Sequence, residues 1–408
     1  MNPEFSPFTP GQPVPIEFFV GRVAEIEQLR SLVRSAARGR FKIGFVTGER
    51  GIGKTSLVSF VRHLSEREDR VAGAHVFLGG ARDVPDMIRR TLDRLLKENV
   101  EKPWYGKLKD FFGKHVGEVG LFGISVELKL TQDDLQQLMH EFVPTIRHLL
   151  TKLKGERKAF LLILDDINGL AHSAEFANWL KSTVDEIATG EEGLNLCMLI
   201  VGLEERRQHL LALQPSLDRV FALTEIRPWD ETETERFFTE TFRNGSATVE
   251  PQALKHMVHY TGGLPVIGHE IGDAVWRAAP TTEITESDAR SGIRQAAEII
   301  GSKFLQPKVI DALRSPRYRS ILRRIASSPF GFHFRRSELL KLLGDDDKRA
   351  LDNFLKRLKD LDVIVTDPEA AAGCYRFANR LHYLYFQIES RKAGAETRRG
   401  SGPPTFLD

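Results

Sequence analysis

The chain has 408 residues, of which 41% are hydrophobic and 28% charged, and its formal net charge at pH 7 is +2. This is the composition of a globular protein with room for two or three domains. The near-neutral charge excludes a chain-wide attraction to nucleic acid or to an acidic membrane. Cys197 and Cys374 are too few and too far apart for a disulfide framework or a zinc site, so we expect a reduced, cytoplasmic setting.

Residues 1–17 are predicted to form an extended arm, because five prolines oppose helix formation there. They lack the basic segment and apolar core that mark a signal peptide. No apolar run in the sequence reaches the roughly 18 residues that a bilayer-spanning helix needs, so we expect no membrane partner.

Strands and helices are predicted to alternate in residues 18–230. The predicted strands are 41–47, 73–79, 159–164, 196–202 and 220–226, and the predicted helices are 54–66, 83–98, 132–153, 174–188 and 204–212. This alternation predicts an α/β domain, a parallel sheet with helices on both faces. An insertion with a short hairpin is expected at about residues 100–130.

A glycine-rich loop follows the first predicted strand and leads into a helix. It fits G-x-x-x-x-G-K-[ST], the phosphate-binding loop of P-loop NTPases. Its glycines let backbone N–H groups turn toward phosphate oxygens, Lys54 would place its charge on the β- and γ-phosphates in catalysis, and the Thr55 hydroxyl would bind Mg²⁺. We therefore expect ATP and Mg²⁺ as cofactors. The predicted nucleotide-binding residues are Gly48, Glu49, Arg50, Gly51, Ile52, Gly53, Lys54, Thr55 and Ser56.

Two adjacent acids, Asp165 and Asp166, follow the apolar strand at 159–164. Ligands bind outside the carboxyl ends of the strands in open α/β sheets. Asp165 would hold the Mg²⁺ shell, and Asp166 would be the catalytic residue that polarises the attacking water. Asp166 is one methylene shorter than the glutamate usual in fast ATPase motors, which predicts slow or conditional hydrolysis.

The pattern becomes helical after residue 230. Residues 231–304 are predicted to form a helical lid and a linker helix. Residues 305–390 have the order of helices and strands of a C-terminal winged-helix domain, and residues 391–408, rich in Gly, Pro and Arg, are predicted to be disordered.

The order of these motifs resembles that of AAA+-related ATPases over roughly residues 17–390. It comprises Phe19-Val20-Gly21-Arg22 before the loop, the two acids after their strand, Gly262-Gly263-Leu264-Pro265 in the lid, and the winged helix. Two branches fit. One comprises the signal-transduction ATPases with numerous domains and their archaeal-type relatives, and the other the origin-recognition-type initiators.

The resemblance implies roles for further positions. Val20 and Gly21 would line the adenine site, and Pro265 would lie near the base. Arg219, just before the last strand of the sheet, would be an arginine finger acting on a neighbouring subunit's γ-phosphate. Each position also has a structural alternative. Val20 and Gly21 could be a hydrophobic anchor for the first helix, Pro265 a proline that starts a helix, and Arg219 a solvated charge at a helix end. Residues 200–203 offer no Asn, Thr or Ser to sense the γ-phosphate, which favours a signalling switch.

The C-terminal module concentrates positive charge, with fifteen Lys and Arg against eight Asp and Glu between Lys303 and Val363. In a winged helix the third helix enters the major groove and nearby cations hold phosphates. Acids flank the same helix, so the alternative is a module that only packs internally. The predicted contacts to double-stranded DNA are Lys348, Arg349, Lys356 and Arg357.

The sequence thus predicts a slow ATPase that acts as an AAA+-like switch. Nucleotide state would reposition the winged helix and control self-association, as a nucleotide-dependent homo-oligomer, or the binding of a protein partner. One alternative is a DNA-binding initiator or loader that assembles on duplex DNA. Another is a nucleotide-binding scaffold without useful turnover.

Overall fold

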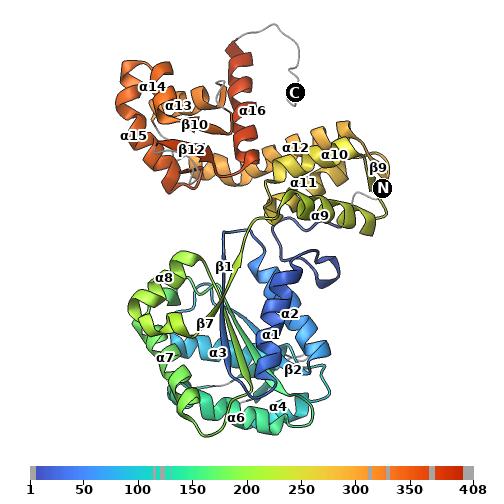
Figure 1. Ribbon diagram of the computed structural model, residues 1–408, viewed down its shortest axis with the longest axis vertical. Coiled ribbons are helices and arrows are strands. Elements are labelled where there is room, and N and C mark those ends of the chain that lie inside the picture. Colours follow the sequence, from blue (N-terminus) through green and yellow to red (C-terminus); the bar gives the residue numbers. More distant parts are fainter. Residues whose placement is uncertain are drawn as a thin grey trace. The chain divides into compact units, whose positions relative to one another are not determined.

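The computed structural model describes residues 6–113, 116–119, 125–128, 130–310, 315–327, 331–366 and 373–397 (Figure 1). The chain divides into two compact units. One is Pro13–Arg227, and the other combines Met1–Gln12 with Pro228–Asp408. Among the described residues, no helix has both the length and the apolar character needed to cross a membrane.

A five-stranded sheet lies at the centre of the unit Pro13–Arg227. Its strands are all parallel and lie in the order β2-β5-β6-β1-β7. Every residue of β5 and β6 is buried, as expected for central strands covered on both faces. The carboxyl ends of β1, β6 and β5 are therefore neighbours at one edge of the sheet. The strands are β1 (Lys42–Gly48), β2 (Val71–Phe77), β5 (Ala159–Asp165), β6 (Leu196–Val201) and β7 (Phe221–Ile226).

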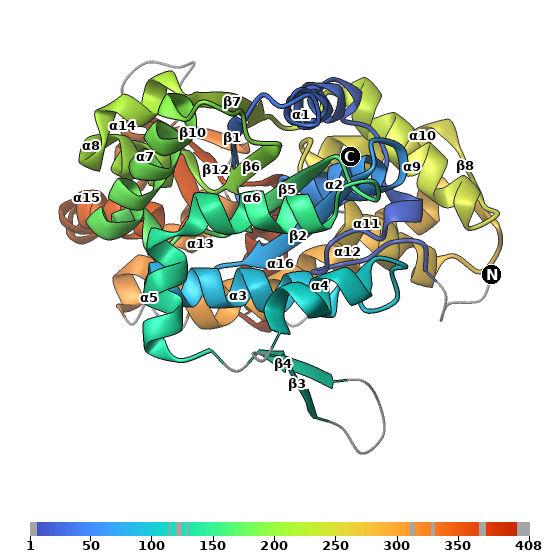
Figure 2. The same ribbon diagram turned by 90° about the horizontal axis from the view of Figure 1, so that it is seen from below.

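Helices cover both faces of this sheet (Figure 2). One face carries α1 (Val23–Ala36) and α2 (Lys54–Glu68). The other carries helices whose apolar side chains form one continuous core with the sheet. The predicted α/β fold is confirmed. These helices are α3 (Val84–Lys97), α6 (Phe142–Lys152) and α7 (Ala174–Thr189), and α8 (Glu204–Leu213) follows β6.

The insertion contains α4 (Tyr105–Phe112) and an antiparallel hairpin of β3 (Val116–Val119) and β4 (Ser125–Leu128), so a hairpin forms where one was expected. The prediction of a single helix at 132–153 was wrong. This segment is split into α5 (Gln132–His140) and α6 by Glu141, whose φ and ψ are −101° and 28°. Pro144 explains the break, because a proline within a helix has no N–H to bond the carbonyl four residues earlier.

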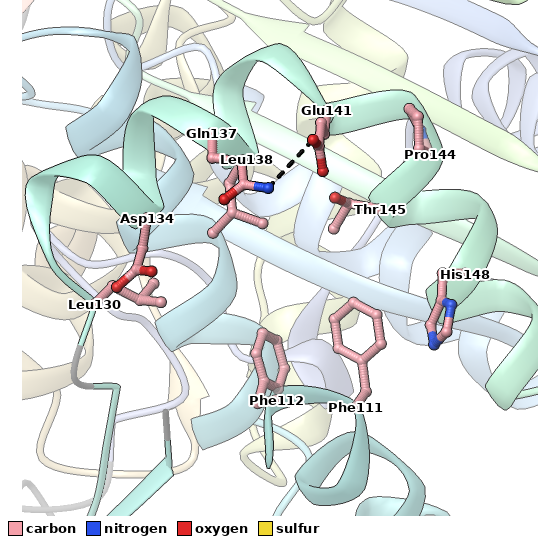
Figure 3. Close-up of a pocket in the computed structure, with 10 residues that line it drawn as sticks. All are labelled: Phe111, Phe112, Leu130, Asp134, Gln137, Leu138, Glu141, Pro144, Thr145 and His148. Carbon is pink, nitrogen blue, oxygen red and sulfur yellow. Dashed lines mark hydrogen bonds between the residues drawn. The ribbon is translucent and has the colours of Figure 1, made fainter. Parts of the chain in front are cut away.

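This break shapes a hollow of about 410 Å³ beside the end of α4 (Figure 3). Phe111 and Phe112 lie on one side of it. On the other side, the Gln137 amide donates a 3.2 Å hydrogen bond to Glu141. None of the predicted nucleotide-binding residues lines this hollow.

The second unit begins with a helical part whose core is aromatic. Its helices are α9 (Glu231–Asn244), α10 (Pro251–Thr261), α11 (Pro265–Ala278) and α12 (Glu286–Ile300), with a short parallel pair of β8 (Thr248–Val249) and β9 (Glu283–Ile284). Capping boxes at Asp230 and Thr285 fix the first turns of α9 and α12. A π-helix, η5 (Gly301–Ile310), continues directly from α12.

The N-terminal residues belong to this helical core. Phe8 is 3% exposed and packs against Phe237 and Phe242, with ring centroids 5.9 and 4.8 Å away. Residues 6–12 of the predicted extended arm therefore pack against these helices. The prolines do exclude α-helix here, but nothing local in the sequence shows that Phe8 has partners more than two hundred residues away. Only η1 (Ile16–Phe18), a 3₁₀ turn, interrupts the extended course that follows.

Among its described residues, the C-terminal module has three helices and a three-stranded antiparallel sheet in the order of a winged helix. Its helices are α13 (Pro316–Ser327), α14 (Arg336–Leu342) and α15 (Asp345–Asp360), and its strands are β10 (His333–Arg335), β11 (Ile364–Thr366) and β12 (Cys374–Phe377). The sequence did not predict β10, which is only three residues long. α15 starts at Asp345, where three aspartates in its first turn favour the positive end of the helix dipole.

The predicted start of the disordered tail was wrong. A last helix, α16 (Arg380–Thr397), extends beyond residue 391, and residues 398–408 lie outside the described part of the chain. Phe377, Tyr385 and Phe386 are buried, so these C-terminal aromatics belong to the core of the second unit.

Candidate nucleotide-binding site

The glycine-rich loop joins β1 to α2. Gly48, Gly51 and Gly53 have φ angles of 151°, 76° and 93°, which L side chains rarely adopt. A Cβ on Gly48 would lie 2.6 Å from the Ile226 carbonyl oxygen, so this position also has no room for a side chain. Gly53 is the N-cap of α2 and cannot cap it with a side chain. The first N–H groups of α2 are therefore suited to bind an anion.

Lys54 lies at the centre of this loop. Its Nζ donates hydrogen bonds to the carbonyl oxygens of Gly48 at 2.7 Å and Glu49 at 2.8 Å. Burial lowers the pKa of Lys54, while the charges of Asp165 and Asp166 act in the opposite direction. The charges of both acids thus act on the Lys54 ammonium, so the structure brings the loop lysine and the two acids into one site.

The two acids differ in their surroundings. Asp165 ends β5, is 3% exposed, and its Oδ2 lies 2.9 Å from Nε2 of His75 on β2. Sequence reasoning missed His75, because a single histidine in an apolar strand has no spacing that points to a partner. Asp166 is exposed, and its Oδ1 accepts a hydrogen bond from the Asn168 side chain.

The backbone of Asp166 is left-handed, with φ 58°. Aspartate and asparagine tolerate this conformation better than most other residues with side chains. Gly79 makes room for the carboxylate, since a Cβ there would lie 2.8 Å from Asp166 Oδ2. The local backbone thus gives a physical reason for an aspartate, rather than a longer glutamate, at this position.

Comparison with known proteins gives a family for this part of the chain. The family model described as AAA ATPase domain matches residues 19–212. The match and the glycine-rich loop together indicate an ATP-binding domain of the AAA ATPase type over this stretch. A search of curated proteins finds no match.

Solved structures show the same fold over nearly the whole chain. A Walker-type ATPase of Pyrococcus abyssi is 18% identical, with a TM-score of 0.55, and the match covers 91% of this chain and 97% of that one. The ORC2 protein of Aeropyrum pernix, solved as ADPNP-ADP complexes, is 16% identical, also with a TM-score of 0.55, over 93% and 96% of the two chains. At these identities the likeness concerns the fold.

The stretch matched by this family model has an acidic residue after β6 that was not predicted from the sequence. Glu204 begins α8 and is held by Arg207, whose Nη2 donates to Glu204 Oε1 at 2.7 Å. The other end of the same guanidinium donates to Asp218 at 3.0 Å. The hydrogen bond from Arg207 is the main cause that lowers the pKa of Glu204. Glu204 is therefore a fixed carboxylate beside the carboxyl end of β6.

Arg219 ends the 3₁₀ turn η4 (Pro215–Arg219), directly before β7. Its side chain is exposed, and it forms no hydrogen bond or ion pair with any residue that the structure describes. Arg207, in contrast, is tied to two acids. Of these two arginines, Arg219 is the one whose charge is available to a second molecule.

The segment before α1 runs past the start of α2. The Val14 N–H donates a 3.1 Å hydrogen bond to the Ser56 hydroxyl, and Phe19 stacks on Phe60 at 4.6 Å. Val20 and Gly21 follow directly and are only partly exposed. The Ser56 side chain thus binds the N-terminal segment, which leaves its backbone N–H as the group that a phosphate would use.

Pro265 is the first residue of α11 and is buried. Gly263 before it has φ 74°, and its carbonyl accepts from the Trp229 N–H at 2.9 Å. Four residues after Pro265, His269 is 5% exposed and is bound to the N-terminal segment. His269 is therefore a packed residue of the helical part. The role of Pro265 near a base stays a prediction.

The DNA-binding residues predicted on α15 fall into two groups. Lys348 is paired with Asp345 at 3.0 Å, within its own first turn. Arg349, Lys356 and Arg357 are exposed and have no ion-pair partner among the described residues. On the same helix, Asp352 is held by Arg336 of α14 through two hydrogen bonds of 2.6 and 2.8 Å.

The residues present fit Mg²⁺. The Thr55 hydroxyl and the Asp165 carboxylate are oxygen ligands, which Mg²⁺ prefers. Within the described part of the chain, no cluster of three or more His, Cys, Asp or Glu could hold a metal by itself.

Proposed function

We propose that the protein is a nucleotide-controlled switch that binds Mg-ATP and hydrolyses it slowly. ATP would be held by the loop Gly48–Thr55, and Asp166 would orient the attacking water. The nucleotide state would then reposition the C-terminal winged helix and control self-association or the binding of a partner. Mg²⁺, when bound, would neutralise phosphate charge.

The observation that carries this proposal is the state of Asp166. Its side chain is short, and one carboxylate oxygen already accepts a hydrogen bond from Asn168. A misplacement of about 1 Å in a reacting group can cost 100-fold in rate. Both features therefore support a site that keeps ATP bound for long periods, as a switch requires.

The surroundings of β6 agree with slow turnover. Gly202 and Leu203 offer no hydroxyl or amide side chain for a γ-phosphate, and the Glu204 carboxylate is already bound by Arg207. Hydrolysis would then depend on a group from outside the subunit. Arg219 is the candidate, because it is exposed and has no partner within the described residues.

The test is to release the acid from its intramolecular hydrogen bond. Asn168→Ala should raise the hydrolysis rate, by about 10-fold or more, without changing ATP affinity, because it frees Asp166 Oδ1 to orient the water. Asp166→Asn is the control and should bind ATP without turnover. A parental or lower rate in folded Asn168→Ala would contradict the proposed cause of slow hydrolysis.

The second candidate function is a DNA-bound initiator or loader. The exposed, unpaired Arg349, Lys356 and Arg357 among the described residues of α15 favour it. The bidentate pair between Arg336 and Asp352 counts against it, because it places a carboxylate on the same exposed side of the helix. The salt dependence of duplex binding, described in the Discussion, separates the two functions.

A further inference from the structure

His75 is a buried polar residue that the predicted chemistry leaves without a role. It lies on β2 between apolar neighbours and is 3% exposed. A buried histidine ring must bond its nitrogens or lose hydration without compensation. Its Nε2 lies 2.9 Å from Oδ2 of Asp165, which is itself 3% exposed. Each residue therefore supplies a partner that the other needs.

The direction of this hydrogen bond follows from its chemistry. An ionised carboxylate only accepts, so the histidine Nε2–H donates to Asp165 Oδ2. The ring is also held from the side, because Phe77 stacks on it with a centroid distance of 4.6 Å and an interplanar angle of 25°. Two independent contacts thus fix the imidazole, and the imidazole fixes one oxygen of Asp165.

Fixing one oxygen has a consequence for the other. A carboxylate with Oδ2 held cannot rotate freely, so Oδ1 is limited to a narrow range of positions. Groups that orient a metal's ligands tune its binding, and their loss typically costs about 10- to 100-fold in metal affinity or activity. Asp165 is the residue to which the Mg²⁺ shell is assigned above.

We propose that His75 is a positioning residue for Mg²⁺, which acts by holding Asp165 Oδ2 so that Oδ1 faces the metal's water shell. This inference rests on the proposed binding of Mg-ATP by the glycine-rich loop. His75 touches neither nucleotide nor metal. Its effect belongs to the metal-dependent part of nucleotide binding, and the metal-free part should not depend on it.

The variants that test this proposal differ in whether residue 75 has an N–H donor for Asp165. Glutamine can place its Nε2–H near the position of the imidazole Nε2–H, whereas methionine has a similar length and no donor. His75→Gln should therefore keep the hydrogen bond, and His75→Met should remove it while still filling the space. His140→Met, an exposed histidine at the end of α5, controls for the substitution itself.

The measurement is calorimetric titration with a non-hydrolysable ATP analogue, first in EDTA and then at increasing Mg²⁺. His75→Met should need about 10- to 100-fold more Mg²⁺ than the parent for the same increase in affinity for the analogue. His75→Gln should need far less extra Mg²⁺, and affinity in EDTA should be equal in all variants. Thermal melting identifies a variant that has not folded. If His75→Met does not fold, Phe77→Leu replaces it, because Phe77 is half-exposed and stacks on His75. Phe77→Leu should also raise the Mg²⁺ requirement for analogue binding, by a smaller factor.

Two results would overturn the proposal. If folded His75→Met has the parental Mg²⁺ requirement, His75 is only a packed core residue. If methionine and glutamine variants lose Mg²⁺ dependence equally, the hydrogen bond is not the cause. Failure of the proposed function is distinct from both, because the parental protein itself would then not bind the analogue.

Discussion

The backbone N–H of Thr9 donates a 3.2 Å hydrogen bond to Nδ1 of His269, across 260 residues of sequence. The bond fixes the N-terminal segment to α11, where Phe8 also packs. Burial lowers the pKa of His269 to about 4, so the ring is neutral near pH 7 and its Nδ1 can accept. The N-terminal segment is therefore attached to the lid helices by a contact that requires a neutral imidazole.

This contact predicts a pH dependence of stability. The pKa of His269 is about 4 when folded and about 6.5 when unfolded, so between these values the unfolded chain binds more protons. Its contribution to stability is complete above pH 6.5 and is lost as the pH falls toward 4, at about 1.4 kcal/mol per pH unit.

Urea unfolding of the helical unit, within the whole protein, should show this slope between pH 7 and pH 5. His269→Gln is the matched variant, since glutamine can accept through its oxygen and does not titrate. The difference in pH dependence between the two proteins isolates His269. Equal slopes would mean that other groups set the pH dependence.

A second prediction concerns Gly272, on the same helix. A Cβ at Gly272 would lie 2.2 Å from the Phe8 ring, so Gly272→Ala cannot keep Phe8 in place. Overpacking of this kind costs about 1–3 kcal/mol. Faster proteolysis of the N-terminal segment and a lower unfolding midpoint should both result.

The matched control removes the Phe8 ring and leaves Gly272 unchanged. Phe8→Ala alone should also destabilise the protein, through a cavity. Gly272→Ala added to Phe8→Ala should then cost little, because the clash is gone. Strictly additive losses in the double variant would show that the two positions do not meet.

Local patterns predicted much of this structure. The alternation of strands and helices gave the sheet, and the spacing of Gly48, Gly53 and Lys54 gave the loop, because each rests on residues close in sequence. The Asp165–His75 and Thr9–His269 contacts join segments 90 and 260 residues apart, and no local spacing encodes such partners. The break in the helix at Glu141, in contrast, could have been predicted from the sequence, because Pro144 lies only three residues further on.

Self-association should depend on Arg219. If this exposed arginine completes a neighbour's site, Arg219→Ala and Lys54→Ala will each be inactive, yet a mixture of the two will regain ATPase activity. Each mixed pair then contains one complete site. Arg227→Ala, an exposed arginine paired with Glu225, is the control and should be neutral. Activity equal to the sum of the separate variants would indicate a monomeric enzyme.

Duplex binding distinguishes the switch from the initiator. If α15 contacts DNA, affinity should fall steeply with salt, with a log–log slope of about −3 to −6, because cations on the protein release counterions. Lys356→Glu with Arg357→Glu should abolish such binding and leave ATP affinity unchanged. For the proposed switch we expect only weak, non-specific binding at physiological salt.

The assay is fluorescence anisotropy with a random duplex at two salt concentrations. Asp352→Asn is an informative companion, because it removes the acid that neutralises Arg336 and should strengthen any true duplex contact. A tight, salt-sensitive complex that the double charge reversal removes would place the initiator function first.

The central claim is that the loop Gly48–Thr55 binds Mg-ATP, and Lys54 is the residue on which it depends most. Calorimetry of ATP with Mg²⁺ should show that Lys54→Ala weakens binding by about 10- to 100-fold, since a charged hydrogen-bond donor to phosphate contributes roughly 1.5–3 kcal/mol. Lys42→Ala, at the opposite end of β1, should bind like the parent. Unchanged ATP affinity in a folded Lys54→Ala protein would contradict the claim.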